Sequence, residues 1–210
     1  MIKKYFLLLL ATILLTGVHG QNRQVDLPKN IPLQDILKKA KKQKKHVLLD
    51  FGSPRCSPCL FIKNKIFTID SVADFINDRF VSVDYTEGPE KKRLSKIYEV
   101  YTEPVLLICD ANGKVMHRME GKCTADEMMT RLRQGLDVKN NLTAQKLMYD
   151  NGDRSSEFLI NYLETLHIAG LRIQRDSVLQ NIFSPSFHID SLKTPKYWNV
   201  FLRYNESPVS

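Results

Sequence analysis

The chain contains 210 residues, of which 43% are hydrophobic, and its formal net charge is +8. This length and apolar content allow a buried core in one domain with an appendage, or in two small domains. The four cysteines are too sparse for a fold that depends on a disulfide framework, and the sequence has neither a glycine-rich phosphate loop nor the pattern of a hydrolase triad.

The first 20 residues have the pattern of a secretory signal peptide. Lys3 and Lys4 precede an apolar run over residues 5–15, which is too short to cross a bilayer comfortably, and small residues follow up to Gly20. We therefore expect residues 1–20 to be cleaved, with an uncleaved N-terminal anchor as the alternative. Cysteines in an exported chain indicate an oxidising compartment, so a periplasmic or otherwise exported location is predicted, without stable membrane insertion after cleavage.

Residues 21–31 are polar and predict a linker. Apolar residues then recur at helical spacing from Leu33 to Ala40, which predicts a helix over residues 32–45. This helix is rich in lysine, and such a cluster could contact phosphates or anionic lipid. We interpret it instead as the solvated face of one helix, and no nucleic acid partner is predicted.

The following segment alternates between strand and helix patterns. Short apolar or alternating runs predict strands at residues 46–51, 80–85, 105–109 and 115–119. Helical spacing predicts helices at residues 56–65, 71–78, 91–98 and 124–136. Thr124 and Glu127 form a capping box at the start of the last helix. This order predicts an α/β fold in which a mixed sheet carries helices on both faces.

The pattern changes after Asp137, because helical periodicity continues without further strand patterns. We predict a domain over residues 32–138, followed by an appendage of three or four helices over residues 139–210. The last helix is rich in aromatic side chains, including Trp198. Either this helix docks on the appendage, which we favour, or it begins a longer helical region.

The sequence Cys56-Ser57-Pro58-Cys59 follows a predicted buried strand and opens a predicted helix. Unpaired N–H groups and partial positive charge at a helix N-terminus favour a thiolate, and Arg55 adds positive charge beside Cys56. Cys59 lies one turn inside the helix and should be less exposed, and Pro58 fits a helix start because it has no N–H to lose there. We therefore predict that Cys56 attacks a substrate disulfide and that Cys59 resolves the mixed disulfide.

The remaining candidate ligands and thiols have simpler interpretations. A structural zinc site needs four ligands, usually as two cysteine pairs, and the sequence has no second pair, so no metal is predicted. Cys109 is predicted to be an inert core thiol. Cys123 is predicted to be inert as well, with a secondary redox role near the rim of the site as the alternative. His46 and His117 flank strands and are predicted to lie at the surface.

Several motifs in order resemble the thioredoxin family. The resemblance covers about residues 32–137 and rests on residues 47–51, the Cys-x-Pro-Cys motif six residues after Asp50, residues 103–107, and residues 112–115 with Gly121. Residues 67–72 and 78–81 are nearer to the thioredoxin-like domain of membrane thiol:disulfide interchange proteins.

The resemblance implies roles for two further residues. Asp50 matches a buried acid beneath the disulfide, where burial should raise the pKa of its carboxyl and let it relay a proton to or from Cys59. A solvated aspartate at the strand end is the alternative. Pro104 matches a proline that follows a cis peptide bond, which would turn the backbone of Glu103 toward the thiols, where an extended substrate could pair with it.

Two residues depart from the family pattern. Arg55 stands where a tryptophan is usual, which removes an aromatic platform and adds a charge. Glu103 stands where a small or β-branched residue is usual, and its carboxylate would either oppose the thiolate-favouring effect of Arg55 or pair with that arginine. We expect Arg55, Pro58, Glu103 and Pro104 to contact the substrate.

The resemblance implies an exported thiol:disulfide oxidoreductase that acts on protein thiols and disulfides. Proline before the second cysteine, as in thioredoxin, favours the reduction of periplasmic proteins, and a membrane electron donor is then an expected partner. The Cys56–Cys59 pair is the redox centre, so no further cofactor is expected. The alternatives are a disulfide oxidant or isomerase of the same fold, or a non-catalytic binding module that acts through its helical tail.

Overall fold

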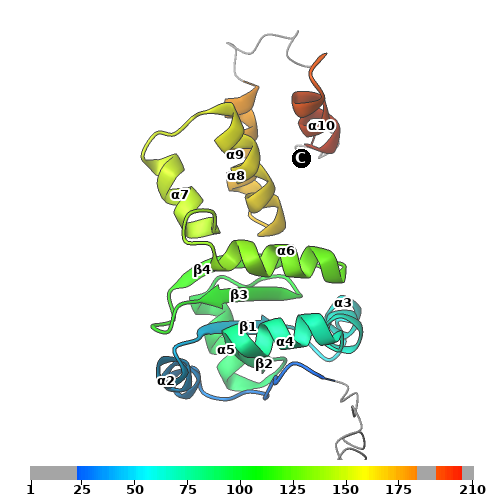
Figure 1. Ribbon diagram of the computed structural model, residues 1–210, viewed down its shortest axis with the longest axis vertical. Coiled ribbons are helices and arrows are strands. Elements are labelled where there is room, and N and C mark those ends of the chain that lie inside the picture. The colour runs from blue at the N-terminus through cyan, green and yellow to red at the C-terminus, as the bar shows by residue number, and fades with distance from the viewer. Residues whose placement is uncertain (1–22, 184–192, 205–210) are drawn as a thin grey trace, which may run out of the picture.

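The structure is a computed structural model that describes residues 23–183 and 193–204 (Figure 1). The predicted signal peptide over residues 1–20 therefore lies outside the described residues. Within the described ranges, no helix is both long enough and apolar enough to span a membrane. A sheet and its covering helices form one end of the molecule, and the helices that follow residue 141 are stacked beyond α6 (Figure 1).

The sheet contains four strands in the order β2-β1-β3-β4. The strands are β1 (His46–Phe51), β2 (Phe80–Tyr85), β3 (Val105–Cys109) and β4 (Val115–Glu120). β1 runs parallel to β2 and antiparallel to β3, and β3 and β4 form an antiparallel hairpin. The predicted mixed sheet is therefore confirmed, and only the end of β4 differs from the predicted strand bounds.

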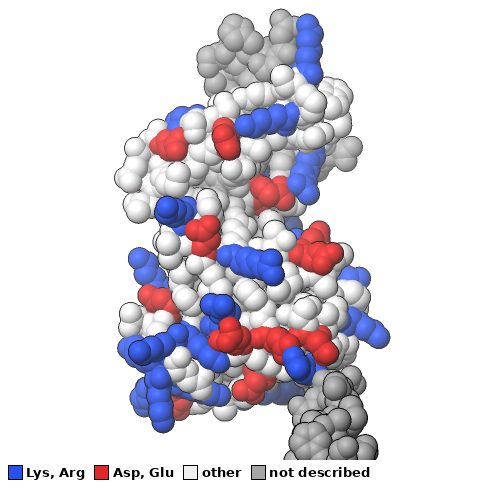
Figure 2. All heavy atoms as spheres, in the orientation of Figure 1, with Lys and Arg blue, Asp and Glu red and all other residues white. Residues whose placement is uncertain are grey.

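Helices cover both faces of this sheet, as predicted. One face packs against α2 (Leu33–Gln43) and α5 (Gly88–Ile97). The other packs against α4 (Asp70–Arg79), α6 (Ala125–Leu136) and the helix that begins after Cys56. Successive side chains of a strand point to opposite faces, which divides the apolar residues of the central strands between two cores. The lysines of α2 are largely exposed and gather at one corner of the surface, which confirms the solvated helix face (Figure 2).

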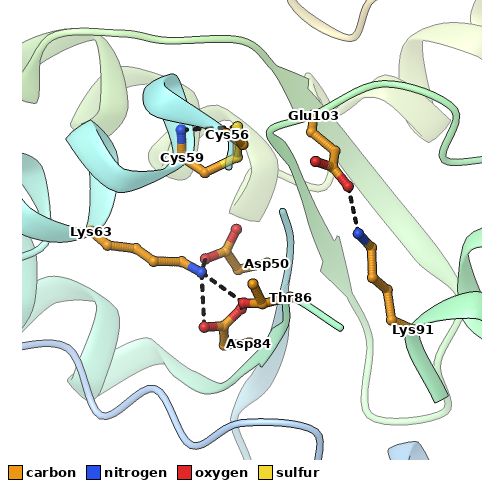
Figure 3. The surroundings of a disulfide bond; sticks show 8 residues. All are labelled: Asp50, Cys56, Cys59, Lys63, Asp84, Thr86, Lys91 and Glu103. Atoms are coloured by element: carbon orange, nitrogen blue, oxygen red, sulfur yellow. Dashed lines mark hydrogen bonds and ion pairs between the residues drawn. A yellow bond between two sulfur atoms is a disulfide. The ribbon is translucent and has the colours of Figure 1, made fainter. Parts of the chain in front are cut away.

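The helix predicted over residues 56–65 forms in two parts. It begins as α3 (Ser57–Phe61) and continues as the π-helical turn η1 (Ile62–Ile66). Single π turns occur frequently at functional sites. Here the turn carries Lys63, four residues after Cys59, and the Lys63 side chain extends toward Asp50 and Asp84 below the disulfide (Figure 3).

Residues 23–31, predicted as part of a linker, lie against the domain instead of connecting freely to it. Val25 is buried in the core. The backbone of Asp84 in β2 donates to Pro28 O at 2.9 Å and accepts from Asn30 N–H at 2.9 Å. The polar side chains of this segment face solvent while its backbone pairs with β2, which explains why its composition is typical of a linker.

The appendage comprises α7 (Leu142–Asp150), α8 (Ser156–Ile168), α9 (Arg172–Ile182) and α10 (Pro195–Tyr204). The last three of these helices share a core that is separate from the two cores of the sheet. The Tyr204 hydroxyl donates to Glu164 of α8, and Arg203 pairs with the same carboxylate. The last described helix therefore docks on the appendage, which is the alternative favoured from the sequence.

The prediction that His117 lies at the surface is wrong, because this side chain is fully buried between β4 and α7. Its Nδ1 accepts a hydrogen bond from the Leu142 backbone N–H at 3.1 Å, at the start of α7. Burial lowers the pKa of His117 to about 4, and the nearby positive charge of Arg131 makes a smaller contribution in the same direction. A neutral imidazole thus supplies the hydrogen-bond acceptor that the start of α7 needs. His46, which was also predicted to lie at the surface, is half-buried at the start of β1.

Candidate active site

Cys56 and Cys59 form a disulfide at the start of α3, with their Cα atoms 5.2 Å apart. Cys56 is the N-cap residue, and its sulfur accepts a hydrogen bond from the Cys59 backbone N–H at 3.2 Å. Cys56 is partly exposed, whereas Cys59 is only 2% exposed. An external sulfur atom can therefore approach Cys56 but not Cys59.

Two buried carboxylates share one ammonium group below the disulfide (Figure 3). Asp50 and Asp84 are register partners on β1 and β2, so their side chains leave the same face of the sheet. The Lys63 Nζ lies 2.8 Å from Asp84 Oδ2 and 3.4 Å from Asp50 Oδ2. The Thr86 hydroxyl accepts a hydrogen bond from Lys63 at 3.1 Å and donates one to Asp84.

Burial dominates the electrostatics of Asp50, which is 2% exposed. Burial raises the pKa of its carboxyl to about 6, while Lys63 lowers this pKa and the negative charge of Asp84 raises it. Asp50 can therefore both accept and release a proton near neutral pH, which general acid–base catalysis requires.

Gly52 allows Cys59 to approach β1 closely. A Cβ atom at residue 52 would lie 3.0 Å from Cys59 Sγ and 3.2 Å from Cys59 Cβ. The same position lies 4.0 Å from the Lys63 Nζ, so Gly52 borders both the buried sulfur and the ammonium group. A side chain at residue 52 would therefore push Cys59 away from β1.

The peptide bond between Glu103 and Pro104 is cis and precedes β3. The Glu103 carboxylate lies close to the disulfide, since one of its oxygens and the sulfurs of Cys56 and Cys59 all lie within 4.8 Å of one another. Burial alone would raise the pKa of Glu103, but hydrogen bonds from Lys91 and Ser53 outweigh burial and lower it. Glu103 is therefore an anion beside the cysteines, and it pairs with Lys91 of α5 instead of Arg55 (Figure 3).

The structure places most of the predicted residues around the cysteines, but at different depths. Asp50 and Pro104 are buried, whereas Arg55, Pro58 and Glu103 are exposed. The buried position of Asp50 excludes the alternative of a solvated aspartate at the strand end.

Three charged residues of the site were not singled out from the sequence: Lys63, Asp84 and Lys91. The helical spacing of four residues from Cys59 could have indicated Lys63. The alternation of β2 could have indicated Asp84, because it shares a face with the buried Phe80. Lys91 had no such signal, since α5 approaches Glu103 only through the tertiary fold.

Cys109 and Cys123 are both free and buried. Burial raises the pKa of Cys109 to about 12 and also raises the pKa of Cys123. Both thiols are therefore protonated at neutral pH, which agrees with the prediction that they are inert.

One cluster of potential metal ligands occurs within residues 23–183 and 193–204: the two disulfide sulfurs with the Glu103 carboxylate. Because both sulfurs are bonded to each other, they could act as thiolate ligands only after reduction. A cavity of about 590 Å³ lies beside α3 and η1 and extends under residues 24–30. Lys63 and Asp84 are among its lining residues.

This arrangement can exchange electrons between two thiols and a disulfide. Cys56 offers an accessible sulfur at a helix N-terminus, which stabilises a thiolate. Cys59 lies behind it above an acid that titrates near neutral pH. Such a pair can form and then release a mixed disulfide with another molecule.

Comparison with known proteins agrees with this chemistry. Residues 33–136 match a family model described as a thioredoxin-like domain. Over 97 residues the chain is 26% identical to thioredoxin Y, chloroplastic, from Oryza sativa subsp. japonica, which covers 46% of this chain and 55% of that protein. The chain thus spans about half the length of the curated relative that it matches.

Solved structures of similar fold include a proposed disulphide isomerase from Bacteroides thetaiotaomicron. It matches with a TM-score of 0.51 and 27% identity, over 56% of this chain and 98% of that chain. A thioredoxin from Thermus thermophilus matches with a TM-score of 0.48 and 22% identity, over 57% of this chain and 93% of that chain. The family model and the first of these structures confirm the fold class predicted from the sequence.

Proposed function

Because residues 33–136 belong to the thioredoxin-like domain family, we propose that this chain is a thiol:disulfide oxidoreductase that reduces disulfides in other proteins through Cys56 and Cys59. The observation that carries the proposal is the arrangement of one accessible and one buried sulfur at a helix N-terminus, above the buried Asp50. A cysteine pair that served only to staple the fold would not require this combination.

In the proposed reaction, the Cys56 thiolate attacks one sulfur of a client disulfide. The first client thiolate leaves and takes a proton from water, and a mixed disulfide joins Cys56 to the client. Cys59 then transfers its proton to Asp50 and attacks the sulfur of Cys56. The second client thiolate leaves with the bonding electron pair, and the Cys56–Cys59 disulfide of this structure is formed.

The client would bind along the loop that contains the cis peptide bond. Pro104 holds the backbone of Glu103 beside the disulfide, where an extended chain could form strand-like hydrogen bonds. The exposed side chains of Arg55, Pro58 and Glu103 would contact the client around Cys56.

We further propose that the protein is exported, on the basis of the signal-peptide pattern over residues 1–20. Each cycle leaves the cysteine pair oxidised, so continued reduction needs an external source of two electrons. A membrane-bound thiol reductant is the partner that would supply them in an oxidising compartment.

The reduction of insulin disulfides tests the proposal. The purified protein should accelerate insulin reduction by dithiothreitol, and Cys56→Ser should abolish the acceleration. Cys59→Ser should instead accumulate a mixed disulfide with the client, detectable by mass spectrometry. Equal rates for the wild type and Cys56→Ser would overturn the proposal and favour a non-catalytic binding module that acts through the appendage.

A disulfide oxidant or isomerase is the second candidate, favoured by the similarity to the proposed disulphide isomerase described above. The reduction potential of the Cys56–Cys59 pair, measured against glutathione, distinguishes the two. A potential near −270 mV, the order found in thioredoxin, supports a reductase, whereas about −180 mV or higher supports an isomerase or oxidant.

A further inference from the structure

The cluster below the disulfide contains one more acid than base. The Lys63 ammonium lies closer to Asp84 than to Asp50, at 2.8 Å against 3.4 Å. Thr86 reinforces this preference, because its hydroxyl accepts from Lys63 and donates to Asp84. Asp50 is left with the longer ion pair, and its Oδ2 is buried without a hydrogen bond among the described residues.

Asp50 is therefore surrounded by groups whose charges act in opposite directions. The charged groups that act on it are Lys63 of η1 and Asp84 of β2. Leu106 of β3 is its apolar register partner, and Cys59 of α3 lies above it (Figure 3). Lys63 and Asp84 line the cavity beside η1, and Asp50 does not. The cavity therefore borders the two ion-pair groups and not Asp50 itself.

We propose that Lys63 and Asp84 are positioning residues for the resolving step: Lys63 keeps Asp50 ionised below Cys59, and Asp84 opposes this by drawing the same ammonium group toward itself. The inference rests on the proposed function, since it concerns the proton that leaves Cys59. An ionised Asp50 can accept this proton, whereas a protonated Asp50 cannot. The ratio of the two forms at a given pH then sets the rate at which Cys59 displaces the client from Cys56.

The two residues should shift the pH dependence of resolution in opposite directions. An opposite charge within about 4–6 Å lowers a carboxyl pKa by roughly 1–3. Lys63→Met should therefore raise the midpoint of the pH–rate profile by about 1 pH unit or more, which slows resolution about tenfold at pH values below the midpoint. Asp84→Asn should lower the midpoint, because the lysine is then free to pair with Asp50.

A reagent with a chromogenic aromatic disulfide measures this step directly. In stopped flow, attack by Cys56 releases one equivalent of aromatic thiol, and resolution by Cys59 releases a second. The rate of the second release is recorded from about pH 5 to pH 9, with Cys56→Ser as the background for Cys109 and Cys123. Lys65→Met is the matched control, because Lys65 is an exposed lysine of η1, and its profile should equal that of the wild type.

A variant that replaces both Lys63 by Met and Asp84 by Asn keeps the experiment decisive if Lys63→Met alone does not fold. It leaves neither charge of that pair buried alone, and its midpoint should return toward that of the wild type. In an Asp50→Asn background, Lys63→Met should cause no further shift, because Lys63 acts through Asp50.

The outcomes separate this inference from the proposed function. Opposite shifts for Lys63→Met and Asp84→Asn support the inference. A second release with the same midpoint in all variants overturns the inference and leaves the proposed function intact. The absence of a second release in the wild type at every pH overturns both.

Discussion

Replacing Asp50 by Asn should make the oxidised protein more stable at neutral pH. The pKa of Asp50 rises from 3.8 to about 6 on folding, chiefly because the carboxyl is buried. Between these two values the folded protein binds more protons than the unfolded chain, so the free energy of unfolding falls as pH rises. The loss is complete above the folded pKa and amounts to about 3 kcal/mol.

The Asn side chain has no charge to desolvate, so Asp50→Asn should not show this loss. The difference in unfolding free energy between the variant and the wild type should therefore grow by about 3 kcal/mol in favour of the variant between about pH 3 and pH 7. Guanidinium unfolding of both oxidised proteins, followed by far-ultraviolet circular dichroism at each pH, measures this difference.

Carboxyls that do not interact with Asp50 contribute equally to both proteins and cancel in the difference. Asp78→Asn is the matched control, because it removes an exposed carboxylate from α4, and Asp50→Asn should show the larger change with pH. A constant difference for Asp50→Asn would refute the argument that desolvation dominates the protonation of this residue.

Three further substitutions test other parts of the structure. Glu103→Gln removes an anion beside the sulfurs and should lower the pKa of Cys56, measured by the pH dependence of its alkylation in the reduced protein. Gly52→Ala places a methyl group against Cys59 and should destabilise the oxidised protein by about 1–3 kcal/mol in guanidinium unfolding. His117 is held neutral in the folded protein, so stability should fall by about 3 kcal/mol as pH drops from about 6.5 to about 4, and His117→Gln should remove this dependence.

Each of these substitutions has a clear contrary result. Glu99→Gln serves as the control for Glu103→Gln, because Glu99 is another exposed acid that precedes β3 in the sequence. A Cys56 pKa that responds equally to both substitutions would contradict a local effect of Glu103. Unchanged stability of Gly52→Ala would show that α3 moves freely away from β1. A pH dependence that is identical in His117→Gln and the wild type would assign the acid sensitivity to other groups.

The sequence predicted the sheet and its helices well because their patterns are local. The short apolar run of β1, the alternation of β2 and the capping box of Thr124 and Glu127 depend on residues within a few positions of one another. The cysteine pair was equally visible, since its spacing and its place at a helix start are both properties of one short segment. The resemblance to a known family then placed Asp50 below it.

The rest of the site depends on contacts between distant segments. Lys63 becomes important only because η1 directs it toward Asp50 and Asp84, which belong to different strands. His117 lies in a strand whose sequence is polar, and its burial depends on α7, which packs over β4. Local patterns indicate which residues are apolar, but they do not indicate which polar residue a later helix will cover.

The pairing of residues 23–31 with β2 has a consequence for the behaviour of shortened chains. An outer strand with unpaired N–H and C=O groups is a template on which a second molecule can add its own strand. Here Pro28 and Asn30 occupy the polar groups of Asp84, so the N-terminal segment shields part of that strand from self-association. A fragment trimmed to residue 32 would keep the whole redox centre and yet expose this template, which makes residues 23–31 a determinant of solubility.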